Sequence, residues 1–404
     1  MSNERQRVPC EVAVIWIDWY AYHVARFAGL NQTPSLAGKV VGLELVSGVG
    51  VHPGLRFRED LPEGIAIETL MPGVSWKEAG KLRLGFMLWQ RLNTLRPRVV
   101  LVPGYYTLPG IAAALWARTH RRCSVLMTES TAFDHRRQPL REAFKSIVLH
   151  LLFSWAVTGG KAHVRYLEQL GFRRSRIAGF YDVVDNFAIR AGTAVVRQQK
   201  LKKTTPTSEP DSPYFLFVGR LAEEKNVETL ISSWIQYRRQ GGRWPLVLAG
   251  DGPSRGGLEK LVEASSFGPY VTFTGLKSLR ELIPIYADAG CFVLPSKREP
   301  WGLVVNEAMA ADLPVLVSRQ CGCREDLVIE GENGHSFEPM DELVLTNYLH
   351  RMERLPRDER VAMGQRSGEI IAGFTPRGFG RAIASIARRY DKASKLHLLP
   401  ETAQ

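Results

Sequence analysis

The chain of 404 residues is longer than one ordinary core and predicts two domains of roughly 150 to 200 residues each. Its composition, 45% hydrophobic and 23% charged residues, is that of a globular protein, and no stretch reaches the roughly 18 uninterrupted apolar residues of a spanning helix. The first ten residues lack the apolar core of a signal peptide and the five cysteines include no Cys-x-x-Cys pair, so we expect a cytoplasmic protein without a metal site.

The net charge of +12 is unevenly distributed. Residues 1–190 hold 25 Lys and Arg against 15 Asp and Glu, whereas the remainder holds 28 against 26. A basic half suggests an acidic binding partner or an anionic membrane surface, with a merely solvated basic surface as the alternative. Arg136, Arg137 and Arg141 precede an apolar helical run and are the cations expected at such a surface. They are not interleaved with aromatics as in RNA-binding modules, so we do not expect nucleic acid.

In the first half, apolar runs typical of buried strands alternate with helical patterns. This repetition predicts a parallel, doubly wound α/β sheet. Ligands of such sheets lie beyond the C-terminal ends of the strands, which makes the loops after the strands the candidates for binding. The predicted strands cover residues 12–17, 40–45, 65–70, 99–102, 124–127 and 155–158.

The loops and helix starts after these strands hold the candidate binding residues of the first half. His23, at the start of the helix after the first strand, either faces the cleft or packs locally. Tyr105 follows the fourth strand. Asp134 and His135 follow the fifth strand and either contact a ligand or cap the helix entered at Gln138, capping being the simpler role.

A linker is expected between the two domains. The first domain covers residues 1–190, and the linker residues 191–213. The run RQQKLKKTTPTSEPDSP, which ends the linker, is rich in charges and turn residues and lacks apolar periodicity, as a hinge would. The second domain then covers residues 214–373, and residues 374–396 form a last helix.

The second domain repeats the strand and helix alternation, with strands predicted at residues 214–218, 246–249, 271–274, 291–294 and 314–317. The first of these strands is followed by Gly219, Arg220 and, before the next helix, Lys225. Arginine is a planar bidentate donor and lysine a compact point charge, so the pair suits a diphosphate. Ordinary solvated cations are the alternative.

The stretch LPSKREPWGLVVNEAMAAD joins a strand end, a tight turn and a helix start. Glu299 lies in the turn and Glu307 in the first two turns of the helix, so both can reach one ligand. The free amides of Gly302, Leu303 and Val304 form the positive end of a helix dipole, which suits a phosphate. A carboxylate accepts two hydroxyl hydrogen bonds at once, so a nucleotide sugar would offer its hexose to the first glutamate and its ribose to the second. Alternatively, a glutamate there only complements the dipole.

This pattern of two glutamates around Pro-Trp-Gly-Leu, together with Gly-Arg-Leu and Lys-Asn after the strand at 214–218, resembles the signature of retaining glycosyltransferases of family 4. The resemblance implies the GT-B fold, with two Rossmann-like domains facing a cleft and the last helix crossing back onto the first domain. It also implies transfer of a hexose from a UDP- or GDP-linked donor to a glycan, lipid-linked or small-molecule acceptor. The basic charge of residues 1–190 suggests that the acceptor is an anionic glycan or a lipid-phosphate carrier at the inner membrane face.

The resemblance also assigns roles to residues. Glu299, Arg220 and Lys225 become the catalytic residues, and no cofactor or metal is implied beyond the donor itself. His23, Tyr105 and Asp134 remain the acceptor candidates. The chain departs from the family at Asp18 to Ala21, which replace a Gly-Gly pair. The donor-binding set is Gly219, Arg220, Lys225, Gly250, Leu276, Pro300, Gly302, Leu303, Val304 and Glu307.

Two other functions remain open. A nucleotide-sugar epimerase or a hydrolase would also bind such a ligand. Glycosidases, however, place two carboxylates across the scissile bond, whereas Glu307 is expected at the ribose. A catalytically silent sugar-nucleotide-binding subunit is the second alternative, but it would not need both glutamates together with Arg220 and Lys225.

Overall fold

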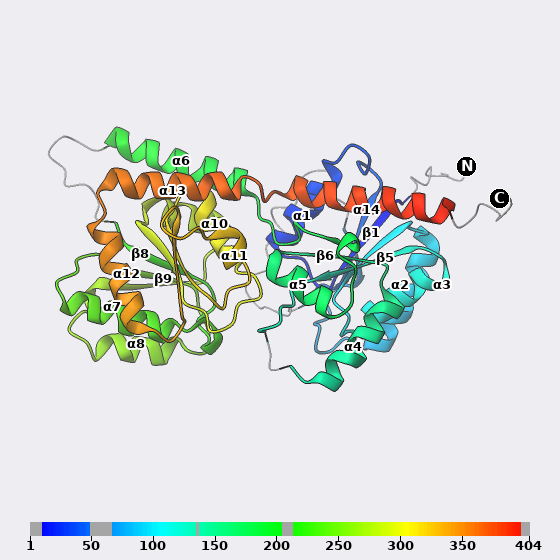
Figure 1. Cartoon of the computed structure of the whole chain (residues 1–404), viewed down its shortest axis with the longest axis horizontal. Coiled ribbons are helices and arrows are strands. Elements are labelled where there is room, and N and C mark those ends of the chain that lie inside the picture. Colours follow the sequence, from blue (N-terminus) through cyan, green and yellow to red (C-terminus); the bar gives the residue numbers. More distant parts are fainter. Residues whose placement is uncertain (1–9, 49–66, 135–136, 204–212, 397–404) are drawn as a thin grey trace.

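The structure is a computed structural model, and it describes residues 10–48, 67–134, 137–203 and 213–396. Two parallel sheets, each covered by helices, lie side by side along the long axis of the molecule (Figure 1). This arrangement confirms the expected pair of doubly wound α/β domains.

The first sheet has seven parallel strands in the order β3-β2-β1-β4-β5-β6-β7. The predicted strands are confirmed to within two residues at each end, and residues 65 and 66 lie outside the described part of the chain. Only β7 was not predicted, because two residues are too few to show a period. The strands are β1 (Val12–Trp16), β2 (Val40–Val46), β3 (Ile67–Met71), β4 (Val99–Pro103), β5 (Cys123–Thr128), β6 (Trp155–Thr158) and β7 (Ile177–Ala178).

Helices cover both faces of this sheet. One face packs against α2 (Lys81–Leu95), α3 (Leu108–Thr119), α4 (Pro139–Leu152) and α5 (Lys161–Gln169). The other packs against α1 (Ala21–Asn31) and the last helix, α14 (Pro376–Leu396), whose Phe379, Ile383 and Ile386 are buried there. The expected return of the last helix to the first domain is therefore confirmed.

The second sheet has six parallel strands in the order β10-β9-β8-β11-β12-β13. The strands are β8 (Phe215–Val218), β9 (Leu246–Ala249), β10 (Val271–Gly275), β11 (Cys291–Leu294), β12 (Val315–Ser318) and β13 (Gly334–Phe337). The helices are α7 (Val227–Arg239), α8 (Arg255–Glu263), α9 (Leu279–Asp288), α10 (Leu303–Ala310), α11 (Arg324–Leu327), α12 (Glu342–Arg354) and α13 (Arg357–Ile371).

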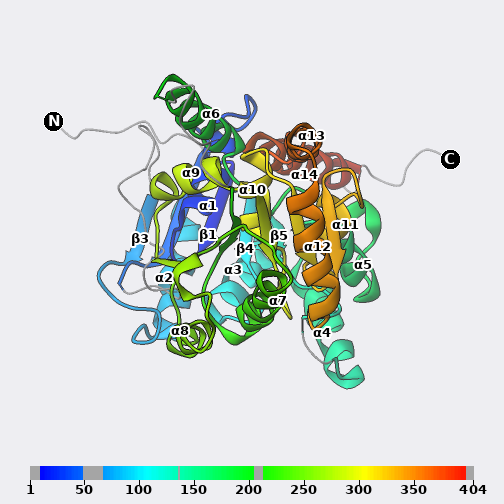
Figure 2. The ribbon, with the colours of Figure 1, turned by 90° about the vertical axis from the view of Figure 1, so that its left-hand side faces the viewer.

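The expected linker is largely helical, which corrects the prediction for residues 191–203. They belong to α6 (Asn186–Lys203), which lies over α9 and α10 (Figure 2). Arg197 donates to the carbonyls of Ala287 at 3.1 Å and Ala311 at 2.7 Å, at the C-terminal ends of α9 and α10, where helix dipoles favour a cation. Arg197, one of the charges that suggested a solvated linker, is thus used in packing. Residues 204–212 lie outside the described residues.

Candidate active site

The predicted donor-binding residues come together at one edge of the second sheet. Gly219, Gly250 and Leu276 follow β8, β9 and β10, and the turn with Glu299 follows β11. These four strands are neighbours and run parallel, so their C-terminal ends meet. Residues far apart in sequence therefore border one site, as predicted for a doubly wound sheet.

Glu299 is buried in this edge and paired with Lys225. The ammonium of Lys225 contacts Glu299 Oε2, and the Ser296 hydroxyl donates to the same oxygen at 3.2 Å. Asn226 Nδ2 donates to the carbonyl of Pro295 at 3.1 Å, which fastens the segment after β8 to the turn after β11. Arg220 contacts Glu224 and remains more than half exposed, so its guanidinium is accessible to a ligand.

The start of α10 supplies the expected amides. Gly302 is its N-cap with φ of +102°, in the left-handed region where a side chain would be strained. The next residues, Leu303 and Val304, are half-buried and begin the helix, so their amides have no intrahelical acceptor. The positive end of the α10 dipole therefore lies next to Glu299, because Gly302 packs on the side chain of that residue.

The Glu307 carboxylate accepts a hydrogen bond across the boundary between the domains. Its Oε2 accepts a hydrogen bond from Tyr286 Oη and its Oε1 accepts one from Tyr22 Oη, both at 2.8 Å. Tyr286 lies on α9 of the same domain, but Tyr22 lies on α1 of the first domain. Burial raises the pKa of the Glu307 carboxyl, and the two hydroxyl donors partly oppose this rise. The carboxylate expected at the ribose thus has a first-domain hydroxyl on one oxygen.

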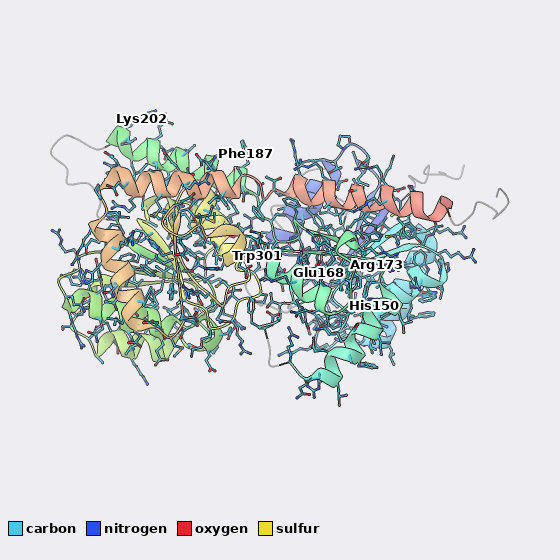
Figure 3. All side chains as sticks on the ribbon, in the orientation of Figure 1. His150, Glu168, Arg173, Phe187, Lys202 and Trp301 are labelled. Carbon is cyan, nitrogen blue, oxygen red and sulfur yellow. The ribbon has the colours of Figure 1, made fainter. Side chains whose placement is uncertain are left out.

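The residues between the two glutamates also contact the first domain. The Trp301 ring lies where the domains meet (Figure 3) and packs against Gly159 and Gly160 after β6. A Cβ atom at Gly160 would lie 2.8 Å from the indole, so only glycine permits this approach. Trp301 Nε1 donates to Asn306 Oδ1 at 2.8 Å, and Asn306 Nδ2 donates to the carbonyl of Asp182 at 3.0 Å. The donor motif is therefore itself part of the domain interface.

A buried histidine completes this interface. His163 Nε2 donates to the carbonyl of Pro300 at 2.8 Å, while its Nδ1 accepts from the Gly160 amide at 3.3 Å. Burial lowers the pKa of His163, which agrees with a neutral ring carrying its proton on Nε2. Farther out, Arg165 forms a bidentate pair with Glu325 at 2.5 and 2.8 Å.

A cluster of charged side chains holds Asp182 in place. Arg26 Nη2 lies 3.2 Å from Asp182 Oδ1 and 3.9 Å from Glu129 Oε1, and its guanidinium stacks 4.1 Å over the Tyr181 ring. Burial, and next the charge of Glu129, raise the pKa of Asp182. The cluster holds in place the loop that receives Asn306. Neither it nor Tyr22 was predicted, because nothing local in their sequence marks them.

The acceptor candidates have mainly structural contacts. The His23 ring stacks on Trp16 with centroids 4.6 Å apart, and its Nδ1 accepts from the Tyr20 amide at 3.3 Å, as in the packing alternative. The expectation that Asp134 caps α4 is wrong: it accepts from the Thr131 amide at 2.6 Å and so closes its own turn, while the α4 N-cap makes no side-chain bond. His135 lies outside the described residues.

Tyr105 is half-buried, and burial raises its pKa. The Lys145 ammonium lies 4.9 Å from its ring and contacts the Tyr166 hydroxyl, and burial lowers the pKa of Lys145 to about 8. Arg137 stacks 4.3 Å over Tyr166 and donates to the carbonyl of Thr131. Of the cations expected at an anionic surface, Arg141 is exposed, Arg137 is partly buried in these contacts, and Arg136 lies outside the described residues.

A cavity of about 220 Å³ lies between the domains beside Glu299. The Glu299 amide donates to the carbonyl of Gln320 at 3.1 Å, and its own carbonyl accepts from the Gly322 amide at 2.9 Å. The glutamate backbone therefore forms the edge of the segment that borders the cavity. The lining residues are Phe133, Ala162, Arg319, Cys321, Gly322, Arg324 and Glu325.

Among the residues that the structure describes, no three His, Cys, Asp or Glu side chains are grouped so as to hold a metal ion. Within the same ranges, none of the helices is both long and apolar enough to cross a bilayer.

Comparison with known proteins agrees with this geometry. Residues 198–369 match the family model described as "Glycosyl transferases group 1". The chain is 36% identical over 180 residues to alpha-D-kanosaminyltransferase of Streptomyces kanamyceticus, covering 44% of this chain and 46% of that protein. It is 30% identical over 129 residues to alpha-monoglucosyldiacylglycerol synthase of Acholeplasma laidlawii, covering 32% of each. The chain thus spans half or less of the length of these curated relatives.

Solved structures cover the whole molecule. Sucrose-phosphate synthase from Thermosynechococcus elongatus superposes with a TM-score of 0.71 at 18% identity, over 95% of this chain and 99% of that one. Anabaena HepE in complex with UDP superposes with a TM-score of 0.67 at 15% identity, over 96% and 100%. The two parallel sheets and these superpositions therefore define a GT-B fold. Residues 198–369, which make up most of the second domain, match the group 1 glycosyl transferases, the family 4 type that the motifs resemble.

Proposed function

We infer that the protein is a retaining glycosyltransferase that moves a hexose from a UDP- or GDP-linked sugar to an acceptor held in the cleft. The observation that carries this inference is the C-terminal edge of the second sheet, where the predicted donor-binding residues come together. There Lys225 contacts Glu299, and Arg220 and the first amides of α10 lie at the same edge of the sheet, which borders a cavity between the domains. The similarity to alpha-D-kanosaminyltransferase supports sugar transfer.

The chemistry proposed for this edge is electrostatic. As the bond from sugar to diphosphate breaks, negative charge grows on the phosphate oxygens, where Arg220, Lys225 and the α10 amides can stabilise it. The acceptor hydroxyl attacks the anomeric carbon from the face that the diphosphate leaves, and a phosphate oxygen takes its proton. Glu299 orients the sugar through its hydroxyls. In this proposal the protein cations offset the diphosphate, and no metal or further cofactor is required.

The acceptor is proposed to be an anionic glycan or a lipid-linked molecule, which would place the enzyme in glycolipid or polysaccharide synthesis. The support is the basic first domain, with 25 Lys and Arg against 15 Asp and Glu. Arg319 and Arg324, which line the cavity beside Glu299, add positive charge on the other side of the cleft. The enzyme would then act at the inner face of a membrane, as a peripheral rather than a spanning protein.

A panel of UDP-, GDP- and dTDP-linked sugars tests the proposal, because slow hydrolysis of the correct donor does not require the acceptor. We expect one nucleotide to raise the melting temperature of the full chain, since a ligand at about 100 times its Kd adds roughly 2.7 kcal/mol. The matching sugar should be released, with its anomeric configuration retained at first by NMR.

The alternatives make different predictions in this panel. An epimerase would return an intact nucleotide sugar of altered configuration. A silent binding subunit would be stabilised by the nucleotide but release no sugar. If none of the nucleotides alters the melting temperature, the donor assignment fails altogether.

A further inference from the structure

Helix α4 carries a row of large apolar side chains on its outer face. The exposed fractions are 87% for Leu140, 69% for Phe144, 59% for Ile147 and 62% for Leu151. On the inner face, Leu149 and Leu152 are buried in the first-domain core. Leucine and phenylalanine are normally buried in a soluble protein, so a helix that exposes four of them in a row marks an interaction surface.

The spacing makes this row a single narrow stripe. At 3.6 residues per turn, positions 140, 144, 147 and 151 fall within an arc of about 60° around the helix. Leu149 points to the opposite side, about 170° from the centre of the arc, which agrees with its burial. Arg141 flanks the stripe and is exposed. The pattern is that of an amphipathic helix with its apolar side facing away from the protein.

The neighbouring helices extend the apolar surface toward the cleft. α2, α3 and α4 cover the same face of the first sheet (Figure 1), and each follows a strand, so each begins at the C-terminal edge of the sheet. That edge faces the second domain, as the contacts of Gly160 and Asp182 show. The exposed large side chains near the starts of α2 and α3 are Leu82, Phe86, Tyr106 and Leu108.

The net charge of this part of the chain indicates which partner the surface binds. Residues 81–152, which include all three helices, hold 12 Lys and Arg against 3 Asp and Glu, a net charge of +9. Nearly all of the +10 of residues 1–190 therefore lies in this segment. A second copy of the chain would bring like charges together, whereas anionic lipid headgroups complement them and their acyl chains accept the apolar stripe.

We propose that the outer face of α4, extended by the starts of α2 and α3, docks the protein on an anionic bilayer by inserting Leu140, Phe144, Ile147 and Leu151. This deepens the proposed function and rests on it, since it orients the cleft so that a lipid-linked acceptor can reach it. Phe133 belongs to the loop that leads into α4 and lines the cavity beside Glu299, so the docked face adjoins the site. Binding thus depends on the apolar stripe as well as on charge.

The test is flotation of the full-length protein with vesicles of phosphatidylcholine alone or mixed with phosphatidylserine. We expect strong binding to the mixed vesicles and only weak binding to phosphatidylcholine alone. Leu140→Glu with Phe144→Glu should weaken binding to the mixed vesicles at least about tenfold, because two large side chains lose their burial. The matched control is Phe187→Glu with Leu343→Glu, which are 82% and 68% exposed. Phe187 lies on α6 at the opposite edge of the molecule (Figure 3), so this variant should bind like the wild type.

Salt and donor hydrolysis separate the remaining outcomes. Added salt screens headgroup attraction but not insertion, so the wild type should keep residual binding that the α4 variant lacks. Equal binding by both variants would overturn the proposal, and so would a loss of self-association in the α4 variant without a loss of vesicle binding. Donor hydrolysis without vesicles should be unchanged in the α4 variant. If vesicle binding fails while hydrolysis persists, only the docking surface is wrong.

Discussion

The two domains share one architecture but contribute differently to the site. In the second domain, the predicted donor residues follow the ends of adjacent strands, and Lys225 contacts Glu299 there. In the first domain, the residues that reach this site, Tyr22 and His163, bind the donor motif itself. In the proposed function the second domain would therefore bind the donor, whereas the first domain holds the motif through these contacts.

The largest effect is expected from Glu299→Ala. Loss of the carboxylate removes the group that orients the reacting sugar and leaves Lys225 without its partner, so turnover should fall by about 10² to 10³ while donor affinity changes little. Initial rates at saturating donor measure this. Glu223→Ala, an exposed glutamate of the neighbouring segment, is the control and should be as active as the wild type. A change in affinity alone would move Glu299 out of the catalytic set.

Glu307→Ala should have a smaller effect, and on binding instead of turnover. The ribose contacts exist in both the ground and the transition state, so their loss should weaken donor binding. Because a hydrogen bond to a charged group contributes roughly 1.5 to 3 kcal/mol, the donor Kd should rise by about 10-fold to 100-fold. Calorimetric titration with the nucleoside diphosphate measures this. If neither substitution changes turnover or the donor Kd, the two glutamates only complement the α10 dipole.

Tyr22→Phe sharpens the comparison between the domains. If a ribose hydroxyl must displace the Tyr22 hydroxyl from Glu307, removing that hydroxyl should tighten donor binding by about fivefold, since one hydrogen bond contributes about 1 kcal/mol. Tyr286→Phe is the matched control, because its hydroxyl binds the other oxygen from within the same domain. Weaker binding by Tyr22→Phe would mean that the first domain helps to hold the donor.

The smallest expected effect is a pH dependence of donor binding. Burial raises the pKa of Glu307, so the carboxyl takes up a proton above the ordinary range near 4.3 and then accepts fewer hydroxyl bonds. Donor affinity should fall as the pH is lowered through this raised pKa. The stability contribution has the opposite sense: it is present below the ordinary pKa and is lost as the pH rises through the raised one. Glu307→Gln should abolish the acid decline in affinity, and a decline that persists would assign it to another group.

The predictions that succeeded depended on local patterns. The strands of both sheets other than β7 and β13 were expected, and so was a helix start within two residues of Leu303, whereas the return of the last helix was expected from the family resemblance. The linker was the main error in the fold. Arg197 looks solvated in sequence, but on α6 it donates to carbonyls at the ends of α9 and α10, and no local pattern reveals these partners. Asp134 was misassigned for the same reason, because its bond to Thr131 depends on how the loop turns.

By itself the sequence determined the two doubly wound domains and the donor motif from Glu299 to Glu307, because strand periodicity, a glycine N-cap and a helix dipole act over a few residues. Only the tertiary structure decided that Tyr22 bonds to Glu307, that Trp301 packs against Gly160, and that α4 turns its apolar side outward. These contacts join residues more than a hundred positions apart or depend on which face of a helix the sheet covers. They follow from the placement of whole elements in space, which no local spacing encodes.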